Sequence, residues 1–200
     1  RVKGEIYNFL DIVPEVTTTI LDKVLLFPNT KPKYVGVRLK SGKDNIKGNL
    51  KLDLPKEWKV SPESIAFQID QKGTEQTVYF EVTPPAQISE VFAKSIATID
   101  NIDYDKEQII IDYDHITKQQ VLKTAEVKCI RTDLKINPEK IAYIMGAGDE
   151  VPQSLTQMGY EVTIVKPEEI TPEKLESFDV VMTGIRAYNT IKTLAYKQGH

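Results

Sequence analysis

The chain has 200 residues, which is room for one large domain or two small ones. Its 26 basic residues against 29 acidic residues give a net charge of −3, so composition predicts no strongly basic surface and no nucleic-acid partner. The single cysteine, Cys129, excludes a disulfide within the chain and a zinc site built from several cysteines. No run of about 18 apolar residues occurs, so the sequence predicts no membrane span.

The chain up to Ile136 consists of short segments rich in β-branched and aromatic residues, separated by turn-forming residues. Several segments alternate apolar and polar residues with a period of two, which is typical of half-buried strands in an antiparallel sheet. Turn signals recur about every ten residues, and this spacing favours a β-sandwich. We therefore predict an Ig-like or fibronectin-like antiparallel β-sandwich over residues 1–136. Its clearest strand candidates are residues 34–39, 49–54, 77–82 and 108–113.

From Asn137 the pattern changes to strands that alternate with helices. Continuous apolar strands separated by helices predict a parallel sheet that is covered on both faces. We therefore predict a flavodoxin-like α/β domain over residues 137–200. An open sheet of this class has about five or six strands, so we expect the domain to be incomplete at its C-terminal end. The predicted strands are residues 141–145, 162–165 and 180–185.

Three helices are predicted between and after these strands. The first carries apolar residues at helical spacing from Val151 onward, and Gly159 is well placed to end it. Thr171 and Pro172 have the residue types of an N-cap and a first helical residue, so they predict the start of a second helix. The third predicted helix covers residues 190–197.

The loop after the first α/β strand contains Gly146 and Gly148, where a dinucleotide-binding fingerprint would lie. The third glycine of that fingerprint would fall at Val151, so the fingerprint is incomplete. Asp149 and Glu150 also place two carboxylates at the start of the helix, where they would repel a phosphate. We expect a tight turn with its own acidic cap, or a site for a cation, an amine or a hydroxylated ligand.

The loop after the third α/β strand contains Arg186, Tyr188 and Asn189. In open α/β sheets, ligands bind outside the carboxyl ends of the strands, where this loop would lie. Together these side chains can hold a carboxylate, a sugar or an acidic neighbour. The alternative is that Arg186 pairs with Asp149 or Glu150 and that Asn189 caps the third helix.

Two residues of the predicted sandwich, Trp58 and Cys129, are candidates for a functional role. Trp58 lies between Pro55 and Pro62 and would offer a glycan-stacking platform if it were exposed; otherwise it covers one end of the core. Cys129 alternates with Val127 in a strand pattern, which favours a buried thiol over a nucleophile. The residues predict no catalytic group and no metal site.

Several phrases of the chain resemble the C-terminal part of the long PIG-L (LmbE-like) family deacetylases of Bacteroidetes. The most specific match is KIAYIMGAGDEVP at residues 140–152, and GYEVT at 159–163 and TGIRAYNT at 183–190 follow in the same order and spacing. IDYDHI at 111–116 is similar to a further phrase of that family. The segment with PKEWKVSP at 55–62 is similar to the galactosidase-associated β-sandwich modules of secreted glycan-processing enzymes.

The resemblance implies that catalysis resides elsewhere in a longer protein. The catalytic domain of the family is an N-terminal, zinc-dependent amidase that removes acetyl groups from N-acetylglucosamine-type sugars. Its metal-binding His-Pro-Asp-Asp run does not occur in this sequence, so we expect that domain, with its zinc, upstream of Arg1. The α/β segment resembles class I glutamine-amidotransferase-like domains, which use a cysteine nucleophile, and no cysteine follows Cys129. We therefore expect a non-catalytic relative.

These observations lead to two hypotheses about function. In the first, the chain is a non-catalytic accessory region of an exported deacetylase, periplasmic or extracellular by resemblance. Its partners would be the upstream deacetylase domain and glycans, and it would hold no cofactor of its own. In the second, the α/β domain binds a small ligand or is enzymatic, with its site at the carboxyl ends of the strands and completed by downstream sequence.

Overall fold

The computed structural model describes residues 12–113, 115–137 and 139–195, and the chain forms two compact units. The first unit holds the chain up to Leu25 together with Thr30–Arg131, and the second holds Leu26–Asn29 together with Thr132–His200. The main division thus falls after Arg131, a few residues before the expected boundary at residue 136. The two units are described separately below.

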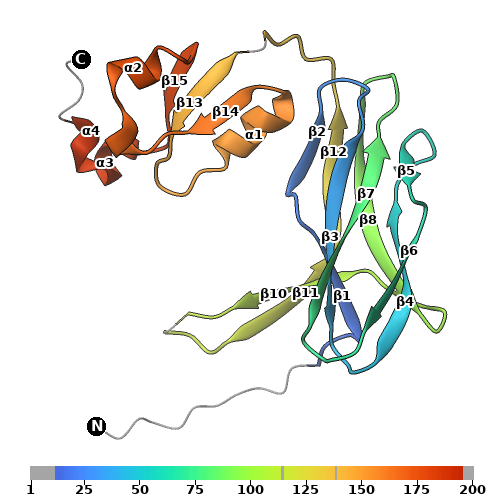
Figure 1. The fold of residues 1–200 in the computed structure, drawn as a ribbon. Coiled ribbons are helices and arrows are strands. Elements are labelled where there is room, and N and C mark those ends of the chain that lie inside the picture. The colour runs from blue at the N-terminus through green and yellow to red at the C-terminus, as the bar shows by residue number, and fades with distance from the viewer. Residues whose placement is uncertain (1–11, 114, 138, 196–200) are drawn as a thin grey trace, which may run out of the picture. The chain divides into compact units, whose positions relative to one another are not determined.

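Most of the first unit is a β-sandwich of two antiparallel sheets, and this fold class was predicted (Figure 1). In the first sheet, alternate side chains of the central strand β3 (Lys33–Ser41) point into the core. Val35, Val37 and Leu39 are fully buried, whereas Arg38 is exposed. This alternation is what the period-two pattern predicted. The sheet has the strand order β1 (Val16–Ile20), β3 (Lys33–Ser41), β7 (Glu75–Thr83), β5 (Lys59–Ser61).

The second sheet of the sandwich follows the same rule. On β8 (Ser89–Ile99), Ala93, Ser95 and Ala97 are fully buried and alternate with exposed or half-buried residues. A buried polar pair joins the sheets, because Thr18 Oγ1 donates to the Ser95 carbonyl oxygen at 3.3 Å and accepts from Ser95 Oγ. The strand order is β2 (Val24–Phe27), β12 (Glu126–Arg131), β8 (Ser89–Ile99), β4 (Ile46–Asp53), β6 (Ile65–Ile69), and β9 (Ile102–Tyr104) also pairs with β8.

The strand that we predicted at residues 108–113 does not belong to either sheet of the sandwich. It contributes to β10 (Lys106–Ile111), which pairs with β11 (Gln119–Thr124) in a separate antiparallel ribbon. Apolar residues occupy both faces of this ribbon, since Ile109 and Ile110 are neighbours on one strand and are 36% and 43% exposed. The sequence pattern predicted a strand correctly but gave no information on its partner.

The second unit contains a three-stranded parallel sheet with the order β14 (Glu161–Ile164), β13 (Lys140–Ile144), β15 (Val180–Thr183). The first strand in sequence is therefore central, and both neighbours pair with it in parallel. Residues Ile141 to Ile144 of β13 are all buried, as expected of a strand with both faces covered.

The end of the first helix and the start of the second agree with the capping residues predicted from the sequence. Helix α1 (Val151–Met158) ends at Gly159, whose φ of 110° is left-handed and whose N–H donates to the Leu155 carbonyl oxygen at 3.2 Å. Helix α2 (Pro172–Leu175) begins after Thr171, whose Oγ1 accepts from the Lys174 N–H at 3.3 Å. None of the helices in the described ranges is long and apolar enough to cross a membrane.

The predicted helix at 190–197 differs from the structure. Two short helices, α3 (Ala187–Thr190) and α4 (Lys192–Ala195), are separated by Ile191, which has an extended backbone; residues 196–197 lie outside the described range. Thr190 Oγ1 donates at 3.2 Å to the Arg186 carbonyl oxygen, which also accepts from the Thr190 N–H at 3.1 Å. Ala187 and Leu194 pack with Ile144 in a small core cluster.

Candidate functional site

The candidate site lies at the carboxyl ends of β13 and β15. We call residues 145–150 the β13 loop and residues 184–186 the β15 loop. The two strands are parallel neighbours, so both loops leave the same edge of the sheet. Backbone hydrogen bonds join them, because the Gly184 N–H donates to Ile144 and the Ala147 N–H donates to Ile185, both at 2.8 Å.

Two glycines allow this close approach. A Cβ on Gly146 would lie 2.2 Å from the Ile185 carbonyl oxygen, and one on Gly184 would lie 2.6 Å from the Gly146 nitrogen. Gly148 differs, because its φ is 58° and the space around it is open. The glycines of the β13 loop are thus explained by packing and by backbone conformation, and neither explanation requires a phosphate.

Asp149 holds the two loops together. Its Oδ1 accepts from the Tyr143 hydroxyl at 2.8 Å, and its Oδ2 accepts from the Ile185 N–H at 3.1 Å. Tyr143 is 1% exposed. Burial, together with the hydrogen bond to Asp149, raises the pKa of Tyr143 to about 12, so the hydroxyl remains a donor at neutral pH. We call the bonds among Tyr143, Asp149 and Ile185 the Asp149 clamp.

The clamp corrects two expectations. The predicted tight turn is present, but not the acidic cap: α1 begins after Glu150, whose side chain makes no cap hydrogen bond, and Asp149 turns to the clamp. The alternative of a pair with Arg186 is wrong as well, since the described residues show no ion pair between Arg186 and either carboxylate. Sequence reasoning missed Tyr143, although a buried tyrosine hydroxyl nearly always needs a partner.

Arg186, Tyr188 and Asn189 lie on one exposed turn beside the clamp. Arg186 has φ 58° and ψ 22°, a left-handed conformation that is uncommon for a residue with a side chain, and it immediately precedes α3. Tyr188 is 45% exposed and Asn189 is also exposed. Asn189 lies inside α3, so the alternative that it caps the third helix is wrong. Within the described residues, no hydrogen bond or ion pair joins these three side chains to one another.

Breaking the Asp149 clamp is expected to destabilise the second unit. Asp149→Ala leaves a buried hydroxyl and an N–H without their acceptor, which costs about 2 kcal/mol. Tyr143→Phe removes only one of the two bonds, and the double variant should show a coupling free energy of about 1 kcal/mol. Amide hydrogen exchange of β13 and β15 measures the loss of stability in each single variant and the coupling free energy between them. Glu168→Ala, an exposed carboxylate of the same unit, is the control; additive single effects would exclude the coupling.

Replacing Arg186 by glycine is expected to stabilise the second unit by about 1 kcal/mol, because glycine adopts left-handed backbone angles without the steric cost of a Cβ. Arg186→Ala removes the same guanidinium but keeps the Cβ, so we expect it to change stability by less than about 0.5 kcal/mol. Hydrogen exchange of α3 and β15 amides reports the difference. Equal stabilisation by both variants would place the strain in the side chain and contradict this account.

The two sandwich candidates are both buried. Trp58 is 4% exposed, and its Nε1 donates to Ser89 Oγ at 3.3 Å. The exposure that glycan stacking requires is therefore missing, and this expectation is corrected: the indole belongs to the core. Cys129 is fully buried, and burial raises the pKa of its thiol to about 12, so it carries almost no thiolate at neutral pH.

The described residues do not provide a zinc centre of the kind expected for the upstream catalytic domain. The His-Pro-Asp-Asp run is absent from the sequence. Across the described ranges, no group of three or more histidine, cysteine, aspartate or glutamate side chains is placed to hold a metal ion.

No family model and no curated protein matches the chain. Among solved structures, a family 123 glycoside hydrolase from Clostridium perfringens is similar with a TM-score of 0.37 at 8% identity, covering 72% of this chain. The chain spans 32% of that hydrolase. A non-cellulosomal cohesin from Archaeoglobus fulgidus has a TM-score of 0.32 at 12% identity, covering 58% of this chain and 91% of the cohesin. The Reelin-N domain of F-spondin has a TM-score of 0.30 at 11% identity, covering 56% and 87%. Scores this low assign neither a fold family nor a function.

Proposed function

We propose that the chain is a non-catalytic accessory region of an exported PIG-L family de-N-acetylase that acts on N-acetylglucosamine-type sugars. In this role it contributes glycan contact, spacing or docking to the upstream catalytic domain. The proposal starts from the phrases at 140–152, 159–163 and 183–190. It is supported by the strand order of the second unit, second–first–third, which is also the beginning of the flavodoxin-like order.

The observation that carries the non-catalytic part is the Asp149 clamp. A catalytic carboxylate at the carboxyl end of a strand must be able to reach a substrate proton or atom. Both oxygens of Asp149 instead accept hydrogen bonds that hold the β13 loop and the β15 loop together. The thiol of Cys129 is buried and protonated at neutral pH, so it offers no nucleophile.

An activity assay tests the non-catalytic part. The chain is incubated with N,N′-diacetylchitobiose, with and without added zinc, and released acetate is measured. We expect no release above the buffer blank in either condition. Zinc-dependent release of acetate would refute the proposal.

The glycan-contact part is tested by affinity electrophoresis in native gels that contain glycol chitin, a soluble polymer of N-acetylglucosamine. Specific retardation of the chain relative to a gel without polymer is the expected result. Unchanged mobility would remove glycan contact from the proposal and leave spacing and docking as its roles.

A second candidate function is small-ligand binding at the β15 loop, and the backbone of Arg186 favours it. Residues held in sparsely populated backbone conformations cluster at binding and active sites. Arg186 is exposed in such a conformation at the edge of the sheet where α/β domains bind ligands. A guanidinium there suits a carboxylate, so citrate is a suitable probe.

Calorimetric titration of the chain with citrate distinguishes this candidate from the first. Binding that Arg186→Ala abolishes and Lys174→Ala leaves unchanged would support it, because both cations are exposed in the same unit. Equal binding by the wild-type chain and Arg186→Ala would exclude the β15 loop as the site.

A further inference from the structure

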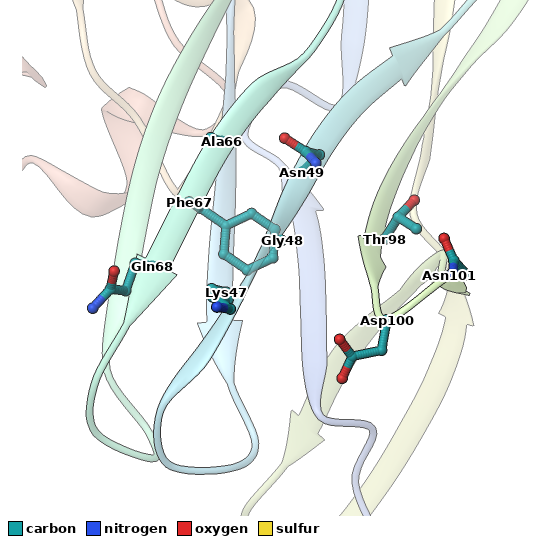
Figure 2. A pocket seen from close by; sticks show the side chains of 9 residues that line it. All are labelled: Lys47, Gly48, Asn49, Ala66, Phe67, Gln68, Thr98, Asp100 and Asn101. Carbon is teal, nitrogen blue, oxygen red and sulfur yellow. The ribbon is translucent and has the colours of Figure 1, made fainter.

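A hollow of about 700 Å³ lies on the β-sandwich, on the sheet that contains β4, β6 and β8 (Figure 2). Lys47 and Asn49 of β4 lie between Gln68 of β6 on one side and the turn after β8 on the other. Small-molecule sites in proteins have volumes of roughly 300–1,000 Å³, so the hollow has room for one or two sugar rings. Its lining consists of Lys47, Gly48, Asn49, Ala66, Phe67, Gln68, Thr98, Asp100 and Asn101.

Strand register brings these residues together from three parts of the chain. Asn49 is paired with Ala66 of β6 and with Thr98 of β8, so it occupies the centre of the lining. Beyond Thr98, the chain turns at Asp100 and Asn101, which have φ values of 47° and 65°. Two consecutive left-handed residues are typical of the tight turn that joins antiparallel strands. This turn forms one side of the hollow.

Two of the polar groups already make hydrogen bonds to neighbouring carboxylates. The Gln68 amide nitrogen donates to Asp70 Oδ1 at 3.0 Å, which leaves its carbonyl oxygen as an acceptor. The Thr98 hydroxyl donates to Asp103 Oδ1 at 2.6 Å, which leaves its oxygen as an acceptor as well. Groups that are already ordered lose less entropy when they bind a ligand.

The chemistry of the lining favours a neutral ligand that is rich in hydroxyl groups. Lys47 and Asp100 carry opposite charges, so an anion or a cation would be attracted by one and repelled by the other. The amides of Asn49 and Asn101 both donate and accept, as vicinal hydroxyls do. Ala66 adds a small apolar surface against which C–H groups of a sugar ring can pack, whereas Phe67, which pairs with Gly48 and is 3% exposed, faces the core.

We propose that this hollow is a saccharide-binding site that accommodates one or two sugar rings. Asn49 makes the central hydrogen bonds to the sugar, and Gln68 and Thr98 accept from its hydroxyl groups. Lys47 donates to the sugar and Asp100 accepts from it, at opposite sides of the hollow. The inference deepens the glycan-contact part of the proposed function by assigning it a site, and it depends on that proposal only in the choice of an amino sugar as the first probe.

Titration of the isotope-labelled chain by NMR tests the site, with N,N′-diacetylchitobiose, cellobiose and maltose as probes. We expect the largest shift changes at the amides of Lys47, Asn49, Gln68 and Asn101. Asn49→Ala should weaken binding at least about fivefold, since it removes the central donor and acceptor. Lys51→Ala is the matched control, because Lys51 is exposed on the same face of β4, two residues away and outside the hollow; it should leave affinity unchanged.

The possible outcomes separate this inference from the proposed function. Binding of cellobiose or maltose, but not of the amino sugar, would uphold the hollow and count against the amino-sugar part of the proposed function. Amino-sugar binding with shifts elsewhere, or with Asn49→Ala equal to wild type, would overturn the hollow and leave glycan contact intact. If none of the three disaccharides binds at millimolar concentration, both the hollow and glycan contact are overturned.

Discussion

Replacing Gly146 by alanine is expected to lower the stability of the second unit by about 3 kcal/mol, at the upper end of what overpacking usually costs. The new Cβ would lie 2.2 Å from the Ile185 carbonyl oxygen and 2.8 Å from the Gly184 carbonyl carbon. Both are backbone atoms, so relief requires the β15 loop to move. That movement would break the hydrogen bond from the Ala147 N–H to Ile185 and displace the Ile185 N–H from Asp149.

Gly148→Ala is the matched control in the same loop. Gly148 has open space around it but a φ of 58°, so alanine there costs only the left-handed backbone penalty of about 1 kcal/mol. Amide hydrogen exchange of β13 and β15 should accelerate about a hundredfold in Gly146→Ala and about fivefold in Gly148→Ala. Equal acceleration in the two variants would contradict the contact between the loops as the reason for Gly146.

The contrast between Gly146 and Gly148 explains the glycine pattern of the β13 loop. In sequence, Gly146 and Gly148 look like part of a phosphate-binding fingerprint, and only Val151 and the two carboxylates argue against it. In the structure, Gly146 has no room for a Cβ because the β15 loop approaches it closely, and Gly148 has a left-handed φ that favours glycine. A site at this edge must therefore be sought in the exposed side chains of the β15 loop and α3.

Local signals in the sequence predicted the named strands, the end of α1 and the start of α2, but not the break in the third helix at Ile191. Alternation predicted the sandwich strands because one face of each sheet is buried, and the end of α1 at Gly159 followed from the freedom of glycine to adopt a left-handed φ. The N-cap at Thr171 was also predictable from local sequence, because its Oγ1 accepts from the Lys174 N–H only three residues away. Each of these features depends on residues that are close together in the chain.

Features that depend on distant pairing were not predictable. The clamp joins Asp149 to Ile185, 36 positions away, and whether a carboxylate turns to its own helix or to a neighbouring loop depends on the sheet order. The hollow depends on register, because Asn49 meets both Ala66 and Thr98 only when β4 pairs with two strands. The pairing of β10 with β11 in a separate ribbon is a further example, because the sequence pattern of a strand does not specify which strand it pairs with.

Above about pH 9, the sandwich is expected to lose stability through Cys129. Burial raises the pKa of this thiol to about 12, whereas an exposed thiol in the unfolded chain titrates near pH 8.5–9. Between these values the native state holds a proton that the unfolded state has released, so stability falls as pH rises. The contribution is fully present below about pH 8.5 and decreases by about 1.4 kcal/mol per pH unit, reaching a loss of about 4 kcal/mol by pH 12.

Cys129→Ala isolates this effect from the lysines and tyrosines that titrate in the same range, because these are common to both proteins. At neutral pH the variant should be less stable by about 1 kcal/mol, since it loses the contacts of the buried sulfur. The difference should vanish near pH 10 and reverse above it. Urea unfolding followed by the fluorescence of Trp58, the single tryptophan of the chain, measures the stability of the same unit. Stability curves that stay parallel from pH 8 to 11 would show that the thiol is not the source of the alkaline loss.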